Sequence, residues 1–416
     1  MRSYRSGKPL LTCPLWLVAT VFAATICISS QLIAQDAIAY SEKKQQAFDL
    51  YKQNKFVEAV PLLEQLATMN NQDRDVFSTL GFCLYSIITI TPEEQKRKNL
   101  ADRSRTALTR AKELGDKTAL TASLLAKLAE GTPGLNKFSS NAEADQAMQE
   151  GEGLFVKGDL EPAVELYKKA LKADPTLYDA ALYIGDAYYK IPGKIDQAGE
   201  WFAKAIAINP DRETAYRYWA DVLMKQGNLN EAREKYVEAY ISEPFNRLTL
   251  SAFVSWGKGQ HLTLSHPAIQ IPTTVQTNDK GNTTITLDDS TLFKGKKDDG
   301  SSAWVIYGIS RSLWAKKFSE EYPKEKTYRH SLKEEADALR ATIGAVKENV
   351  RKSKDLDPSL RTLIRLEQDG VLEPYILLAK SDAGIAQDYP AYLKEHRDSL
   401  RRYALNWVVK DEQGKK

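Results

Sequence analysis

The sequence predicts an all-α fold: an α-solenoid of repeated helix pairs, followed by a mainly helical C-terminal domain with a small β-hairpin. Three observations predict it. The stretch EAREKYVEAYISEP, which ends at Pro244, has close copies at 161–175 and 196–210. A second short helical pattern precedes each copy, as in stacked helix pairs. From about residue 260 the composition changes, and alternating apolar runs appear.

The first 39 residues are predicted to be a secretory signal peptide. Arg2, Arg5 and Lys8 precede an apolar stretch at 10–28, and an Ala-x-Ala cleavage site follows at 37–39. The alternative is an uncleaved anchor formed by residues 10–28, which is close to the length that spans a bilayer. We therefore expect a periplasmic or secreted protein, or one that residues 10–28 anchor in the inner membrane.

The charge balance argues against nucleic-acid and anionic-membrane partners, and the cysteine content argues against a disulfide bond. The chain has 58 Lys and Arg against 55 Asp and Glu. This balance gives no support to the binding of nucleic acid or of an anionic membrane surface. After loss of the signal peptide, Cys83 is the single cysteine, so no intramolecular disulfide can form. We interpret Cys83 as a buried core residue.

The copies share a frame at intervals of 35 and then 34 residues. Its slots are two small residues, an aromatic residue and a final proline, filled by Ala163, Ala198 and Ala232; Ala170, Ala205 and Ala239; Tyr167, Phe202 and Tyr236; and Pro175, Pro210 and Pro244. The preceding helices carry small residues at Gly151, Gly185 and Ala220. We expect the small residues to let antiparallel helices approach, the aromatic ring to fill the gap between units, and proline to end the second helix.

A period of about 34 residues with two amphipathic helices per unit resembles the tetratricopeptide repeat family. The resemblance covers residues 42–256, and the chain is similar to secreted bacterial tetratricopeptide proteins with an uncharacterised C-terminal region. It implies divergent helices at 40–130, a loop at 131–143, and three regular units with a capping helix at 144–258. Within the divergent part, we expect TITPEEQKRKNLADRS to be a long connection between two helices.

The remaining chain is predicted to hold a β-hairpin and loop at 259–302, a helical domain at 303–409 and a disordered tail at 410–416. Two alternating runs about the turn NDKGN indicate the hairpin. One amphipathic helix is predicted from the apolar stripe Leu332, Ala336, Leu339, Ile343, Val346 and Val350. A further stripe runs through Leu393, His396, Leu400, Tyr403 and Trp407, where we interpret His396 as a core histidine.

We predict no catalytic residue, no metal site and no cofactor. The strongest contrary cluster is His330, Glu334 and Glu335, because a helix would bring His330 and Glu334 onto one face, as a metal site needs. We favour a capping box in which Ser331 is the N-cap and Glu334 reaches back to its amide. The alternative function is an envelope enzyme or ligand-binding protein with its site in the C-terminal domain around His330.

The resemblance implies that the first helices of the repeats line a concave groove for a partner. Counted from the small positions, the groove residues are Met148, Glu152, Phe155, Leu182, Asp186, Tyr189, Arg217, Asp221 and Met224. An acid follows each small position, which predicts a row of carboxylates; a solvated helix face is the alternative. We therefore expect an extracytoplasmic interaction scaffold whose partner is a protein or peptide with basic and apolar side chains.

Overall fold

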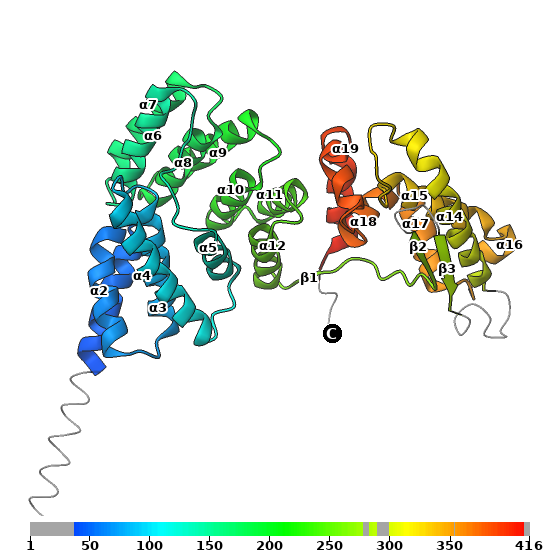
Figure 1. Cartoon of the computed structure of the whole chain (residues 1–416), viewed down its shortest axis with the longest axis horizontal. Helices are drawn as coiled ribbons and strands as arrows, with labels where there is room; N and C mark the ends of the chain where they lie inside the picture. Colours follow the sequence, from blue (N-terminus) through cyan, green and yellow to red (C-terminus); the bar gives the residue numbers. More distant parts are fainter. Residues whose placement is uncertain (1–36, 278–282, 289–298, 353, 412–416) are drawn as a thin grey trace, which may run out of the picture. The chain divides into compact units, whose positions relative to one another are not determined.

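The computed structural model describes residues 37–277, 283–288, 299–352 and 354–411. It confirms the all-α fold, with helix pairs followed by a mainly helical region that contains a hairpin (Figure 1). The chain forms two compact units, Met1–Ala180 and Ala181–Lys416. The predicted signal peptide falls almost entirely outside the described residues. Within the described part, no helix is both long and apolar enough to cross a bilayer.

The first unit consists of antiparallel helix pairs. A helix over residues 37–52 is followed by α2 (Phe56–Met69), α3 (Arg74–Ile88), α4 (Glu94–Glu113), α5 (Ala119–Ala129), α6 (Ala142–Phe155) and α7 (Leu160–Ala173). Leu63, Leu66 and Leu84 are fully buried in its core. Cys83 is buried and free, as predicted, and burial raises the pKa of its thiol to about 12.

The predicted long connection before residue 105 is wrong, because most of it is the first half of α4. The segment is highly charged but rich in residues that favour helices. Its charges pair along the helix surface, as between Glu94 and Lys98 at 2.6 Å and between Asp102 and Arg105 at 2.7 Å. Spacings of three and four residues place such pairs side by side.

In the second unit, the repeat helices lie where the frame predicts them. They are α8 (Tyr178–Lys190, which spans the unit boundary), α9 (Ile195–Ile208), α10 (Glu213–Lys225), α11 (Leu229–Ser242) and the terminal α12 (Arg247–Gly259). Gly227 turns the chain between α10 and α11 with a φ of 79°, a conformation that glycine adopts without steric cost.

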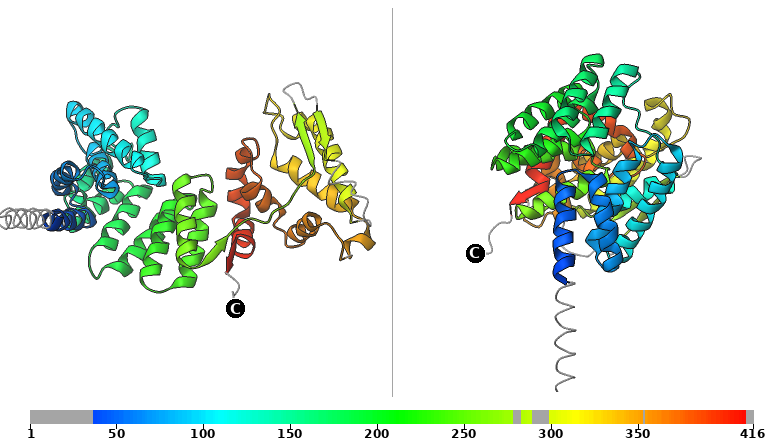
Figure 2. Two further views of the ribbon diagram at one scale, coloured as in Figure 1. Left: turned by 90° about the horizontal axis from the view of Figure 1, so that it is seen from below. Right: turned by 90° about the vertical axis from the view of Figure 1, so that its left-hand side faces the viewer.

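In the described residues of the C-terminal region, the hairpin is combined with six α-helices. It contains β2 (Thr273–Thr277), β3 (Thr283–Leu287), α14 (Trp304–Glu321), α15 (Leu332–Ala345), α16 (Glu348–Arg351), α17 (Pro358–Gln368), α18 (Leu372–Ala379) and α19 (Tyr389–Tyr403), with short 3₁₀ turns at Ser301–Ala303 and Ile385–Asp388. The predicted hairpin is confirmed and packs against α14 (Figures 1 and 2), while its turn lies outside the described residues.

The single amphipathic helix predicted over residues 332–350 is interrupted. The α15 helix ends at Ala345, and Val346 is extended, with φ −71° and ψ 117°. The guanidinium of Arg351 donates hydrogen bonds to the carbonyls of Ile343 and Val346. These bonds satisfy backbone groups that the helix end exposes, so the break is stable while Val346 and Val350 stay buried.

His396 is not the core histidine that its position on the apolar stripe predicted. Its backbone departs from helical geometry, with φ −130° and ψ 28° inside α19. Its side chain is 51% exposed, and its ring lies against that of Tyr392, with centroids 4.6 Å apart.

The end of the chain forms a strand that the sequence pattern did not reveal. β1 (Leu262–Leu264) pairs antiparallel with β4 (Val409–Asp411). The predicted disordered tail is therefore wrong for Lys410 and Asp411, and residues 412–416 lie outside the described part. One hydrophobic core extends from α10 and α11 into the C-terminal helices and includes Tyr236, Trp304 and Tyr403. The proposed division into domains stays a prediction.

Candidate functional site

The aromatic slot of the repeat frame packs onto the small slot of the same repeat. A Cβ atom on Gly151 would lie 2.5 Å from Tyr167 Cε1, and one on Gly185 would lie 2.5 Å from Phe202 Cε1. The Phe202 ring also meets Tyr218 of the next repeat edge to face, with centroids 5.8 Å apart. The small residues thus allow close helix approach, and the ring fills space within and between repeats.

The acid after each small position is tied to the aromatic slot. Tyr167 donates its hydroxyl to Glu152 Oε1 at 2.5 Å, and Tyr236 donates its hydroxyl to Asp221. In the middle repeat the ring is Phe202, which has no hydroxyl, and Asp186 lies 3.8 Å from Lys190 Nζ instead. In two of the three repeats, therefore, the acid has a structural role that its recurrence alone did not reveal.

Two of these acids lie in the second unit and are poorly neutralised. Asp186 exposes 25% of its side chain, and Asp221 is half-buried. Burial raises the pKa of both carboxyls, although Lys190 at Asp186 and the Tyr236 hydrogen bond at Asp221 oppose the rise. A raised carboxyl pKa means that burial penalises the ionised form more than its partners stabilise it. A cation that approached this face would stabilise both carboxylates.

The rest of the face on α8 and α10 is held by ion pairs and ring contacts. Arg217 donates to the buried Glu213 through Nε at 2.9 Å and Nη2 at 3.1 Å. Lys225 Nζ lies 3.6 Å from the centroid of the Tyr189 ring, a cation–π contact. These side chains are partly exposed but fixed, as a preformed binding surface requires.

Two of the predicted groove residues cannot contact a partner. Met148 is fully buried and Leu182 is 4% exposed. Each lies three residues before a small slot, at Gly151 and Gly185, and side chains three apart share a helix face. That face packs against the second helix, so the assignment of Met148 and Leu182 to the groove is wrong. The placement of the other seven in a groove stays a prediction.

The cluster around His330 is organised differently from the predicted capping box. Ser331 caps α15, because its hydroxyl accepts a hydrogen bond from the Glu334 amide at 3.3 Å. The Glu334 carboxylate does not reach back to Ser331. It accepts from Arg311 Nε at 2.6 Å and from Tyr328, because a buried carboxylate needs a charged partner more than an amide.

His330 lies between two carboxylates just before α15. Its Nδ1 is 2.7 Å from Asp382 Oδ2, and its Nε2 is 3.1 Å from Glu335 Oε2. Burial lowers the pKa of His330, but its hydrogen bonds to Glu335 and Asp382 outweigh burial and raise it. In the described ranges, no group of three or more His, Cys, Asp or Glu is arranged to hold a metal ion.

Sequence reasoning missed Arg311 and Tyr307 of this cluster. Arg311 Nη1 donates to the Tyr307 hydroxyl at 3.0 Å and to Glu335 Oε2 at 3.1 Å. The available signal was a lone arginine within the otherwise apolar run AWVIYGISRSLW, since such a residue needs a buried acidic partner.

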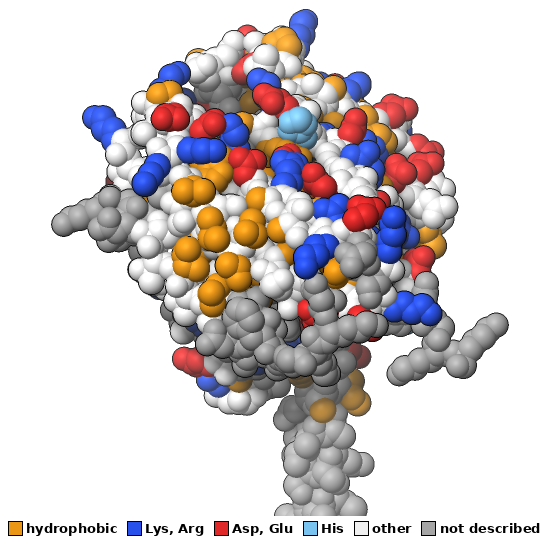
Figure 3. All heavy atoms as spheres, turned by 90° about the vertical axis from the view of Figure 1, so that its right-hand side faces the viewer, with side chains coloured by type: hydrophobic (Ala, Val, Ile, Leu, Met, Phe, Trp, Pro, Cys, Tyr) orange, Lys and Arg blue, Asp and Glu red, His pale blue; other side chains and the backbone are white. Residues whose placement is uncertain are grey.

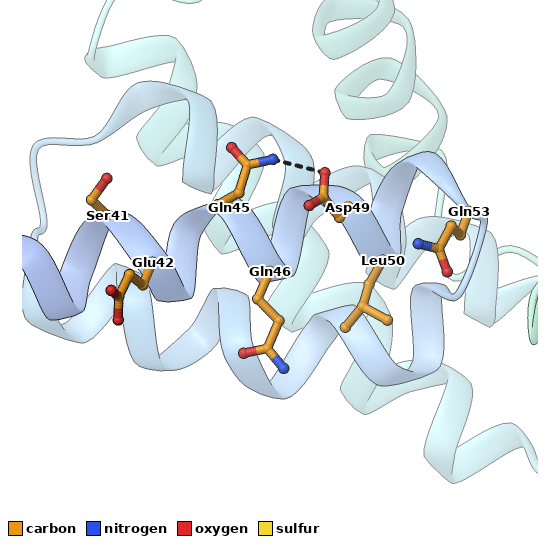
Figure 4. A pocket seen from close by; sticks show the side chains of 7 residues that line it. All are labelled: Ser41, Glu42, Gln45, Gln46, Asp49, Leu50 and Gln53. Carbon is orange, nitrogen blue, oxygen red and sulfur yellow. Dashed lines mark hydrogen bonds between the residues drawn. The ribbon is translucent and has the colours of Figure 1, made fainter.

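Two further surface features are weaker candidates for a binding site. A hollow of about 600 Å³ borders the helix over residues 37–52 (Figure 4), but its lining from Ser41 to Gln53 comes from that helix alone. Apolar side chains also gather on one face of the C-terminal region (Figure 3). Ile285 of β3 and Ile309 and Leu313 of α14 are 38%, 44% and 56% exposed. Among the described residues, no second element encloses the hollow beside its carboxylates Glu42 and Asp49.

The fold and the repeat frame define a protein built on tetratricopeptide-type helix pairs. The family model of the tetratricopeptide repeat matches residues 154–218, which confirms the resemblance over this part of the chain. No curated protein matches the chain in sequence.

Several solved structures share local similarity with the chain. MamA is 17% identical over 48% of this chain and 94% of its own, with a TM-score of 0.24. YrrB, described as a TPR protein with an unusual peptide-binding site, is 15% identical over 52% of this chain and 96% of its own, with a TM-score of 0.23. The TPR2AB domain of yeast Sti1, in complex with pHSP90, is 16% identical over 52% of this chain and 99% of its own, with a TM-score of 0.25.

Proposed function

We propose that the chain is an extracytoplasmic scaffold whose repeat helices bind a peptide or a partner protein. One observation carries the proposal: the exposed face of α8 and α10 is preorganised. Asp186, Tyr189, Arg217 and Asp221 each have a partner within the second unit. Side chains that are already fixed lose little conformational freedom on binding, which favours affinity.

The partner that suits this face carries basic and apolar side chains. Asp186 and Asp221 have raised pKa values because of burial. A Lys or Arg of the partner would offset the free-energy cost of burying their negative charges. Tyr189 and Met224 are partly buried and supply apolar surface. Charge pairing would guide encounter, and aromatic contacts would hold the complex.

A pull-down from cell-envelope extract, with the full chain as bait, tests this proposal. The double variant Asp186→Asn, Asp221→Asn removes both charges but keeps an oxygen that can accept the Tyr236 hydrogen bond. The control Glu231→Gln, Glu234→Gln removes two exposed charges from α11. We expect the first variant to lose the captured partner and the control to keep it. Undiminished capture by the first variant contradicts binding at this face.

Location outside the cytoplasm is part of the same proposal and is supported by the order of residues 1–39: basic, then apolar, then small. We also propose that the chain has no catalytic activity and binds no nucleic acid. The alternative, a ligand-binding site near His330, is favoured by a separate observation, the cleft beside β2.

A further inference from the structure

A cleft of about 800 Å³ opens in the C-terminal region of the second unit. Its lining joins four consecutive residues of β2, from Thr273 to Gln276, with Arg311, His330 and Asp382. Side chains alternate between the two faces of a strand. Because consecutive residues all border the cleft, it runs along an edge of β2 rather than over one face.

Among the described residues, this edge of β2 has no partner strand. There β2 pairs with β3 alone, in a register that joins Thr273 to Leu287 and Val275 to Ile285. Just outside the ladder, the Asp288 amide donates to the Pro272 carbonyl at 2.9 Å. Hydrogen-bonded pairs alternate along an antiparallel ladder, so the backbone groups of Thr273 and Val275 point away from β3. In the described ranges, no backbone group pairs with them.

Arg311 presents unused donors to the same cleft. Its side chain is 9% exposed, and its Nε and Nη1 are bound by Glu334, Glu335 and Tyr307. Its Nη2 has no hydrogen-bond partner within the described chain. Because Nη2 is not among the buried atoms that lack a partner, it is open to the cleft, where it can donate to an acceptor of a ligand.

The charge around the cleft selects the kind of ligand. Three bases line it: Arg311, Arg329 and His330. Five carboxylates bind these bases: Glu325, Glu334, Glu335, Asp382 and Asp388. Glu334 and Glu335 are buried, and of these five carboxylates Asp382 is the one in the described lining of the cleft, so it is the acid that a basic side chain of a ligand can reach. The Asp382 side chain is 52% exposed, so it can pair with a basic side chain of the ligand.

We propose that this cleft binds an extended peptide segment that adds a strand to β2 and carries a Lys or Arg side chain. The peptide backbone bonds the free amides and carbonyls of Thr273 and Val275, as in strand addition to an open sheet edge. Arg311 Nη2 donates to a peptide carbonyl, and the basic side chain pairs with Asp382. This site is separate from the repeat face and adds a second recognition surface.

The test measures binding of the full chain, in detergent buffer, to a fluorescent capped peptide of about eight residues, a usual strand length. The peptide alternates Val and Thr and carries one central Lys. Val275→Pro removes the amide that points to the free edge, whereas Val275→Ala keeps it. We expect the proline variant to weaken binding about tenfold, the effect of one or two lost hydrogen bonds, and the alanine variant to bind nearly as wild type.

Changes in the peptide test the same contacts with the protein left intact. N-methylation of every second peptide amide should abolish binding in one of the two possible methylation patterns and spare it in the other. Replacement of the peptide Lys by Glu should abolish binding. Asp382→Asn should weaken binding of the Lys peptide. Equal binding of the methylated peptides, or of the Glu peptide, overturns the proposal. Loss of binding in Asp186→Asn, Asp221→Asn also overturns it, because that result places the peptide on the repeats.

Discussion

Tyr236, on the second helix of the last repeat, donates its hydroxyl to Asp221 on the first helix of the same repeat. The two residues are 15 positions apart, as are Tyr167 and Glu152, which make the same contact. The hydrogen bond joins the two helices of a repeat at the carboxylate that we predicted to face a partner. One acid therefore serves both the stability of the repeat and the charge of its surface.

The first prediction concerns this hydroxyl. Tyr236→Phe leaves a half-buried carboxylate without its donor and should lower the free energy of unfolding by about 1–3 kcal/mol. The matched control is Tyr375→Phe, because the buried Tyr375 hydroxyl has no hydrogen-bond partner in the part of the chain that the structure describes. We expect the control to be neutral or slightly stabilising in urea unfolding. An equal loss in both variants would show that the Asp221 contact adds nothing.

The second prediction compares two glycines on α6. An added Cβ at Gly151 meets the Tyr167 ring at 2.5 Å, whereas at Gly153 it meets nothing within 4 Å. Gly151→Ala should destabilise the chain by about 1–3 kcal/mol through overpacking. Gly153→Ala should stabilise it by about 0.5–1 kcal/mol through helix propensity. Thermal melts of the two variants should therefore shift in opposite directions, and a shared direction contradicts the proposed helix contact.

The third prediction concerns the contact between α11 and α19. The buried Glu238 accepts from Arg397 Nη1 at 3.0 Å and also from Arg401. Glu238→Ala removes this partner from both arginines, which keep Asp211 and Asp398, and should cost about 1–3 kcal/mol. Glu395→Ala, which removes a carboxylate with 74% exposure, is the control and should be neutral. Limited proteolysis should release the C-terminal helices faster only in the first variant.

The fourth prediction is a pH dependence at His266. Its Nδ1 lies 2.8 Å from the Tyr403 hydroxyl and its Nε2 lies 3.3 Å from that of Tyr240. Burial, and then the charge of Lys410, lower the pKa of His266 below its ordinary value of 6.5. The unfolded chain then binds more protons, so this contribution is complete above pH 6.5 and is lost as pH falls towards the folded pKa.

Urea unfolding at about pH 7.5 and pH 5.5 measures this effect. We expect His266→Gln to lose less stability on acidification than wild type does. His330 has the opposite effect, because its pKa is raised in the folded chain. Its contribution to stability is fully present below pH 6.5 and is lost as pH rises through the folded pKa. His330→Gln should therefore lose more stability on acidification than wild type does. If acidification changes the free energy of unfolding equally in wild type and in both variants, both assignments are wrong.

The fifth prediction concerns the mature N-terminus. If the Ala-x-Ala site at 37–39 is cleaved, the mature chain begins at Tyr40. This residue then keeps its hydrogen bond to Asp73, at 2.8 Å, which ties the new end to α3. N-terminal sequencing of the native protein should find Tyr40. A membrane-bound protein that still carries Met1 would instead show that residues 10–28 are an anchor.

The sequence predicted those parts of the fold that depend on neighbours within one repeat. The periods of 35 and 34 residues and the slots at Gly185 and Phe202 located the helix pairs, because helix periodicity and close packing are local constraints. The hairpin was equally local, as a turn joins its two strands. The same reasoning misplaced Met148 and Leu182, since it took the side chains three residues before each small slot to face a partner.

Tertiary structure alone decided the pairing of β1 with β4 and the assembly of the cleft beside β2. Each strand of the β1–β4 pair has three residues, too few for a readable pattern, and the two lie at opposite ends of the C-terminal region. The cleft brings together Arg311, His330 and Asp382 from separate elements. By itself the sequence determined where the regular repeat helices lie and how each of these repeats closes, because those interactions are short in range. The partners of a buried charge depend on the packing of the whole unit, and only the folded chain settles them.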